Sequence, residues 1–228
     1  MKKSAQTTVA IIGLGNIGKV LATNLAKGKH KVIVASREFT KAKEFADTSG
    51  EQITAKKIKE AIIEADVIIP SISFNLIKEF LKNYATELSG KIIIDVSNPI
   101  APNGNGGFKK IIGENESAAK IFSELIPNGA KLVKAFGTLG ADTLKNEAFN
   151  ESERKTLFYA SDNINTNPQI EELISASGFE PLHIGGIEQS IRIEVFGDLH
   201  EFGKLGKPVS LAEAKIAASQ SKIKSVIQ

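Results

Sequence analysis

A glycine-rich turn near residue 13 is the pattern with the clearest chemical meaning in the chain. It consists of Gly13, Leu14, Gly15, Asn16, Ile17 and Gly18. It follows the apolar segment 9–12 and precedes an amphipathic stretch, which is the setting of a G-x-G-x-x-G turn between a strand and a helix. The first glycine allows the tight turn, the second leaves room for a phosphate, and the third lets the helix pack closely on the strand. Because backbone N–H groups at such a helix start bind anions, the pattern predicts a site for the pyrophosphate of a dinucleotide.

The end of the next predicted strand, residues 31–35, carries the residues that distinguish the two nicotinamide dinucleotides. An acidic side chain at this place accepts hydrogen bonds from the ribose 2′-hydroxyl of NAD. Here Ser36 and Arg37 follow the strand, and their hydroxyl and guanidinium suit a 2′-phosphate, while Lys41 adds a further cation. Glu38 is a neighbouring residue that favours NAD instead. On balance these residues favour NADP as the cofactor.

The histidines and tyrosines offer no recognisable catalytic group. The three histidines lack the spacing of metal ligands, so no metal site is predicted. His30 is expected at the surface, His183 as a structural residue in an edge strand, and His200 either in a cleft or on a solvated helix face. Neither tyrosine has a lysine four residues on, as a short-chain dehydrogenase would require. Hydride transfer between two ring cofactors needs alignment more than an acid or base, so the catalytic residues stay unassigned.

The elements that position these residues alternate between short apolar runs and amphipathic stretches. Strands are predicted at 8–13, 31–35, 66–70, 91–95, 131–135, 156–160 and 181–184, with a weaker one near 52–54. Helices are predicted at 16–28, 40–49, 74–86, 117–125, 167–177 and 211–225. This order predicts an α/β fold of the Rossmann type, a doubly wound and mostly parallel sheet with a short C-terminal helical tail. The turn-rich segment 97–115 is expected to be an irregular loop.

The length and composition narrow the class of protein further. The 228 residues are expected to divide into a domain at 1–206, which includes the acceptor cleft, and a tail at 207–228. The chain has no cysteine, which excludes disulfides, thiolate metal sites and a cysteine nucleophile. The 29 basic and 26 acidic residues are interspersed, so nucleic acid is not an expected partner. No apolar run approaches the length of a membrane span or a signal peptide, so we expect a cytoplasmic protein.

Five motifs, two of which contain the residues already described, extend the pattern over most of the chain, from residue 8 to about 206. They are GLGNIGK at 13–19, ASRE at 35–38, DVSNP at 95–99, KAFGTLGA at 134–141 and GGIEQSIRIE at 185–194. In this combination the sequence resembles the family of NADPH-dependent deazaflavin (coenzyme F420) reductases and predicted dinucleotide-binding enzymes. Its nucleotide-binding unit also resembles the cytosolic domain of transmembrane metalloreductases.

The resemblance implies a single Rossmann-type domain that holds NADP, with a flavin or deazaflavin against the nicotinamide for hydride transfer. It implies that Leu14, Asn16 and Ile17 lie along the pyrophosphate, with Ser36 and Arg37 on the 2′-phosphate. It implies Ile72 and Ser73 on the nicotinamide side, Asn98 and Pro99 in the next loop, and Thr138, Leu139 and Ala141 near the nicotinamide ring. Ser71 follows the strand 66–70, at the carboxyl edge where doubly wound sheets bind ligands. The sequence departs from the family at Gly137, where members often carry asparagine, and at Arg192, which is displaced by one position. A different small acceptor is therefore also open.

Two other interpretations remain open at this stage. The chain is either an oxidoreductase or a non-catalytic NADP-sensing regulatory module, because no catalytic side chain is identified. A hydroxyacid dehydrogenase or imino-acid reductase starts with a similar turn but usually adds a large helical domain, for which too few residues follow Glu194. A homodimer is expected because a lone terminal helix often packs across a two-fold axis. The acceptor and the direction of hydride flow are not predicted.

Overall fold

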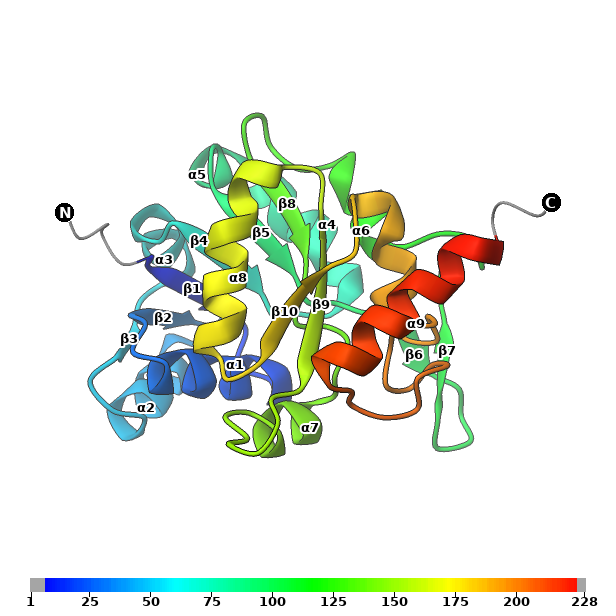
Figure 1. Ribbon diagram of the computed structural model, residues 1–228. Coiled ribbons are helices and arrows are strands. Elements are labelled where there is room, and N and C mark those ends of the chain that lie inside the picture. Colours follow the sequence, from blue (N-terminus) through cyan, green and yellow to red (C-terminus); the bar gives the residue numbers. More distant parts are fainter. Residues whose placement is uncertain (1–6, 225–228) are drawn as a thin grey trace.

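The strand β1, Val9–Ile12, lies inside the sheet and is buried along its whole length. It pairs in parallel with β2, Val32–Ala35, on one side and with β4, Val67–Pro70, on the other. All three strands are runs of apolar residues, as expected for parallel strands that helices cover on both faces. The structure is a computed structural model that describes residues 7–224 of the chain, with side chains for 7–220 (Figure 1).

The central sheet has eight strands in the order β10-β9-β8-β5-β4-β1-β2-β3. The other five strands are β3 (Ile53–Ala55), β5 (Ile92–Asp95), β8 (Lys131–Lys134), β9 (Thr156–Ser161) and β10 (Glu180–His183). Strand β9 runs antiparallel to β8, and β10 runs parallel to β9, so these two are reversed relative to the rest. The carboxyl ends of β1, β2, β4, β5 and β8 therefore meet at one edge of the sheet, where doubly wound folds bind ligands.

Helices cover both faces of this sheet (Figure 1). One face is packed by α1 (Asn16–Lys27), α2 (Phe39–Thr48), α7 (Ala141–Asn146) and α8 (Asn167–Ala176). The other is packed by α3 (Ile58–Glu64), α4 (Phe74–Asn83), α5 (Ala85–Leu88) and α6 (Ala118–Ser123). Alternate residues of β1 enter the two cores, since Val9 and Ile11 face one and Ala10 and Ile12 the other. The predicted Rossmann-type, doubly wound fold is confirmed.

The C-terminal part completes the domain beside the reversed strands. A 3-10 helix, η1 (Ile164–Thr166), follows β9, and a second one, η2 (Ile187–Ile193), follows β10. The last helix, α9 (Leu211–Lys224), confirms the predicted helical tail, and its Ala214 belongs to the same buried hydrophobic cluster as Phe158 of β9. Residue 225 of the predicted range 211–225, the chain start at 1–6 and the end at 225–228 lie outside the described residues. No helix within residues 7–224 is long and apolar enough to cross a membrane.

The segment expected to be an irregular loop, 97–115, forms a small hairpin instead. Its strands are β6 (Ile100–Pro102) and β7 (Phe108–Lys110), which pair antiparallel. The Asn103 side chain closes the turn, because its Oδ1 accepts hydrogen bonds from the backbone N–H groups of Asn105 and Gly107. The glycine-rich composition thus indicated the turn, but the strands were too short to recognise.

Other expectations also need correction. The helices α3 and α7 were not predicted, and the predicted helix 74–86 is broken into α4 and α5 at Tyr84. His30 was expected at the surface but is 1% exposed, and its Nε2 lies 2.7 Å from a carboxylate oxygen of Glu172 on α8. His183 lies in the edge strand β10 as predicted, and its ring stacks on that of Tyr159.

Candidate functional site

Helix α1 begins within the glycine-rich turn, at Asn16, and no side chain of the described residues caps its N-terminus. Gly13 has a φ of 105°, which side chains rarely allow. At Gly18 a Cβ atom would collide with the carbonyl oxygen of Gly13, so glycine is what lets α1 lie this close to the turn. At Gly15 a Cβ atom would meet no atom within 4 Å. The turn therefore leaves an open space in front of backbone N–H groups, which suits a diphosphate.

The turn opens into a cleft of about 900 Å³, a volume typical of small-molecule sites. The predicted cofactor residues that line it are Gly13, Leu14, Gly15, Ser36, Arg37, Lys41, Ser71, Ile72 and Ser73. They follow β1, β2 and β4, which are neighbours in the sheet. Of the remaining turn residues, Asn16 is exposed, Ile17 packs against the core, and Gly18 is buried. The structure thus brings the pyrophosphate and ribose predictions together in one cleft.

Charged side chains gather where β2 ends. The Nζ atom of Lys41 lies 2.8 Å from Oε1 of Glu38, and both side chains are about two-thirds exposed, at 66% and 65%. An ion pair with that exposure contributes little, so Lys41 is released from it at small cost. Arg37 is exposed and forms no hydrogen bond or ion pair with any side chain or backbone group of residues 7–220. Its guanidinium is therefore free to bind an anion in the cleft.

The predicted nicotinamide-side residues Asn98, Pro99, Thr138, Leu139 and Ala141 do not line this cleft. They form a second group in the loops that follow β5 and β8. Asn98 ties these loops to the C-terminal segment: its Nδ2 donates to the carbonyl oxygen of Gly137 at 3.1 Å, and its Oδ1 accepts from the N–H of Val195 at 2.7 Å. The structure therefore arranges the predicted residues as two groups along one edge of the sheet. In the second group, the hydrogen bonds of Asn98 hold the loops to the C-terminal segment.

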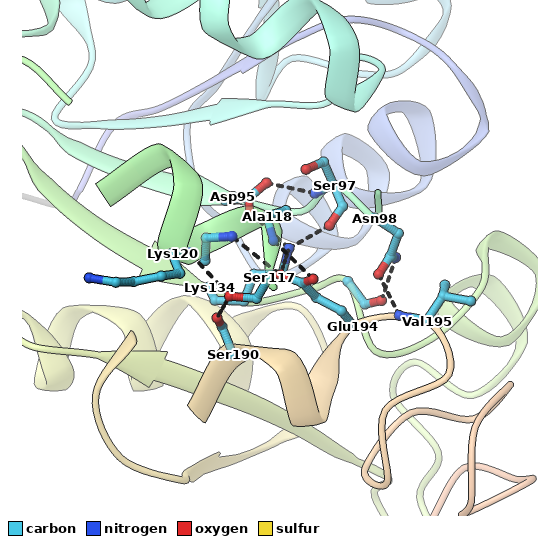
Figure 2. Close-up of polar contacts among 12 residues, drawn as sticks. Asp95, Ser97, Asn98, Ser117, Ala118, Lys120, Lys134, Ser190, Glu194 and Val195 are labelled. Carbon is cyan, nitrogen blue, oxygen red and sulfur yellow. Dashed lines mark hydrogen bonds and ion pairs between the residues drawn. The ribbon is translucent and has the colours of Figure 1, made fainter. Parts of the chain in front are cut away.

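Figure 2 shows a buried ion cluster that the sequence analysis did not single out. It consists of Asp95, Lys134 and Glu194, each at most 2% exposed. The Nζ atom of Lys134 lies 2.8 Å from Asp95 and 3.3 Å from Glu194, and it also donates to the carbonyl oxygen of Ser97. Glu194 accepts two further hydrogen bonds from backbone N–H groups of the first turn of α6, at 3.0 and 3.2 Å. The cluster thus fastens β5, β8, α6 and the C-terminal segment together.

The protonation of the ion cluster follows from its burial and its partners. Burial alone would lower the pKa of Lys134, but the charges of Asp95 and Glu194 outweigh it and raise that pKa above its usual value. Burial raises the pKa of Glu194, and the charge of Lys134 and the backbone donors only partly offset this. At neutral pH Lys134 is therefore charged.

His200 is the buried histidine closest to the second group. Its Nε2 lies 2.9 Å from the carbonyl oxygen of Gly137, and its Nδ1 accepts a hydrogen bond from the N–H of Phe202 at 3.0 Å. A neutral ring with its proton on Nε2 satisfies both partners. Burial lowers the pKa of His200 to about 4, and the charge of Lys134 adds to this effect. Of the two expectations for His200, the solvated helix face is excluded, because only 1% of the residue is exposed.

We expect His200 to make the stability of the protein depend on pH. Between its ordinary value of 6.5 and its folded pKa of about 4, the unfolded chain binds a proton that the folded chain does not. Lowering the pH through this range therefore favours unfolding, and for His200 alone we expect a loss of up to about 3 kcal/mol. Urea unfolding of wild type and His200→Gln at pH 7 and pH 4.5 measures it.

The relevant quantity is the difference in stability loss between wild type and His200→Gln. The raised pKa of Glu194 makes stability depend on pH with the opposite sign, and this effect is common to both proteins. Glutamine keeps a donor for the Gly137 carbonyl but does not titrate. We therefore expect the wild type to lose more stability than His200→Gln on acidification. Equal losses in the two proteins would contradict the assignment of His200 as buried and neutral.

Several cleft residues were missed by sequence reasoning. Besides Glu38 and the residues already predicted, Lys19, Glu44, Phe45, Thr48, Leu76, Glu79, Asn83 and Tyr84 line the cleft. Leu76, Glu79 and Asn83 are spaced by three and four positions, so they lie on one face of α4. That helix starts directly after Ser73, at the carboxyl end of β4, and this position was the available signal.

The fold and the glycine turn define the class, a Rossmann-type domain of the dinucleotide-binding kind. Within this class, residues 8–99 match the family model described as NADP oxidoreductase, coenzyme F420-dependent. The resemblance that the motifs predicted is thereby confirmed for the nucleotide-binding segment, which is similar to this family.

Individual relatives extend this similarity over most of the chain. The chain is 27% identical to the F420-dependent NADP reductase of Methanocaldococcus jannaschii over 202 residues, which cover 84% of this chain and 89% of that protein. It is 28% identical to metalloreductase STEAP3 of Rattus norvegicus over 186 residues, 82% of this chain but only 35% of the metalloreductase. The chain therefore spans about a third of the length of that relative. A crystal structure of a hypothetical protein from Sinorhizobium meliloti is 28% identical, with a TM-score of 0.77, and the match covers 90% of this chain and 96% of that chain.

Proposed function

We propose that this chain is an NADP-dependent oxidoreductase that transfers a hydride between NADP and a small acceptor with a flavin-like or deazaflavin ring. The observation that carries the proposal is the free guanidinium of Arg37 in the same cleft as the uncapped start of α1. A diphosphate and a 2′-phosphate need these two features at the ends of neighbouring strands. The family match and the relatives named as NADP reductases support the same cofactor.

The residues of the chain fit such a cofactor without rearrangement of the turn. Gly15 leaves open space where a diphosphate would approach, and Gly13 shapes the turn beneath it. Arg37 and the weakly paired Lys41 would hold the 2′-phosphate, with Ser36 as a hydroxyl partner. NADP, when bound, supplies or receives the hydride at its nicotinamide ring.

The second group of residues would hold and orient the nicotinamide half. Asn98 and His200 both hydrogen-bond the Gly137 carbonyl and so fix the loop that carries Thr138. The Thr138 hydroxyl is buried without a hydrogen-bond partner among the described residues, which leaves a donor unused beside this loop. Such a rigid loop serves alignment and the exclusion of water, which is what transfer between two rings requires.

We predict that Arg37→Ala removes most of the preference for NADPH over NADH. The lost contact is a charge-assisted hydrogen bond, worth about 1.5–3 kcal/mol, so we expect NADPH affinity to fall on the order of 10- to 100-fold. NADH affinity should change by less than about threefold, since the unphosphorylated ribose gives Arg37 no anion to bind. Titrations of both nucleotides, followed by fluorescence, measure this. If the substitution weakens both nucleotides equally, Arg37 does not read the 2′-phosphate.

A second candidate function is a non-catalytic NADP-sensing module. The observation that favours it is that His200, Asn98 and the ion cluster are all engaged in internal contacts, so none is free to exchange a proton with an acceptor. Nucleotide-dependent association, with no NADPH oxidation by any flavin or ferric acceptor, would select this function.

We also propose, for either function, the division at residues 206 and 207, a homodimer through α9 and a location in the cytoplasm.

A further inference from the structure

The ring of Phe202 is an exposed aromatic side chain beside the loop that follows β8. It is 63% exposed, although its backbone is held firmly by the hydrogen bond from its N–H to His200. Its ring lies 5.5 Å from the His200 ring between centroids. A Cβ atom at Gly140, in the loop after β8, would lie 3.1 Å from the Cζ atom of Phe202. One part of the ring is thus packed against the loop, and the rest is open to solvent.

The segment that carries Phe202 is bonded to this loop along its length. The Glu201 carboxylate accepts hydrogen bonds from the N–H of Gly140 and, at 2.8 Å, from the hydroxyl of Thr143. The N–H of Glu201 donates to the carbonyl oxygen of Thr138 at 3.2 Å. The ring therefore has a fixed place relative to the loop, and no described side chain covers its open part.

The order of the strands tells where this ring lies relative to the proposed cofactor. Arg37 follows β2 and the glycine turn follows β1, so the adenosine half lies over β2 and the diphosphate over β1. The nicotinamide half then extends in the other direction, over β4 and β5 toward β8. Figure 1 shows α7, which begins just after the β8 loop, at the same end of the sheet as the start of α1. A molecule that exchanges a hydride with the nicotinamide must therefore lie close to this loop.

We propose that Phe202 forms one wall of the acceptor site and stacks on a planar heteroaromatic ring bound beside the nicotinamide. This inference rests on the proposed function and assigns the residue that recognises the acceptor. A tricyclic flavin or deazaflavin ring has two large faces, of which only one can turn to the nicotinamide. An aromatic side chain such as Phe202 would cover apolar area on the acceptor's other face, in an offset-stacked arrangement. A small acceptor without an aromatic ring would gain nothing from this wall.

The test uses riboflavin as the probe and the full chain saturated with NADP⁺, and it measures riboflavin affinity by quenching of its fluorescence. We expect Phe202→Ala to weaken riboflavin binding about tenfold or more and Phe202→Tyr to stay within about threefold of wild type. NADP⁺ affinity should remain unchanged in both.

Ile164→Ala is the matched control. Ile164 is 76% exposed and follows β9, whose reversed direction places it at the opposite edge of the sheet. Wild-type affinity of Phe202→Ala for riboflavin would overturn the inference, and so would a wild-type protein that binds NADP⁺ but no riboflavin at millimolar concentration. A protein that binds no NADP⁺ at all would instead contradict the proposed function.

Discussion

Gly15→Ala should abolish most nucleotide binding while the protein stays folded. Gly15 has ordinary backbone angles, φ −71° and ψ −171°, and a Cβ atom would meet no protein atom within 4 Å. The added methyl group would occupy the space in front of the N-terminus of α1, where the diphosphate must lie to reach the backbone donors. We expect NADPH affinity to fall on the order of 100-fold, which corresponds to about 2.7 kcal/mol. Calorimetric titration measures the affinity, and thermal unfolding should show an unchanged midpoint.

Gly18→Ala provides the contrast, since its Cβ atom would collide with the backbone oxygen of Gly13. This variant should lose stability as well as binding, because backbone cannot move aside as a flexible side chain does. The Gly15 variant thus tests what nucleotide binding requires, and the Gly18 variant tests what the packing of α1 on the turn requires. If Gly15→Ala binds NADPH like wild type, the diphosphate does not lie on this turn.

Lys134→Met should cost about 3–5 kcal/mol of stability at neutral pH, because it leaves Asp95 and Glu194 buried without their shared cation. Methionine fills a similar volume, so the loss reports charge rather than a cavity. Chemical unfolding measures the free energy. The double variant with Glu194→Gln should recover part of the loss, since one of the two uncompensated carboxylates is then absent.

Glu194→Gln alone is the control for this experiment. Burial already raises the pKa of Glu194, so a neutral amide at this place should be tolerated far better than loss of the lysine. A Lys134→Met protein as stable as wild type would show that the cluster does not hold the C-terminal segment in place.

The fold was predictable because its local patterns agree with its tertiary structure. The apolar run 9–12, the glycine turn and the amphipathic helix after it each favour the same βα unit, and the structure has them in that form. The missed helices are short: α3 has seven residues and α7 has six. Segments of that length give only one or two repeats of helical periodicity, so packing rather than sequence determines them.

The site was predictable where it depends on the backbone and unpredictable where it depends on distant partners. Gly13 and Arg37 belong to two short motifs that follow neighbouring strands, and each motif is continuous in sequence, so their common cleft followed from strand order. His30 was misplaced because its partner Glu172 is 142 residues away. The role of Lys134 could not be predicted either. Its partner Asp95 lies 39 positions before it in the sequence, and its other partner, Glu194, comes after β10. Burial of such groups arises only when the whole chain has folded.

Because β9 and β10 run in the reversed direction, their carboxyl ends lie at the edge of the sheet opposite the proposed cofactor site. Connections after the parallel strands lie at the edge of the sheet where we propose that the cofactor binds, whereas η1, which joins β9 to α8, lies at the opposite edge. That edge is therefore the place where this architecture tolerates extra length, a fused module or a docking partner without disturbing nucleotide chemistry. Related chains that acquire new attachments would be expected to carry them there.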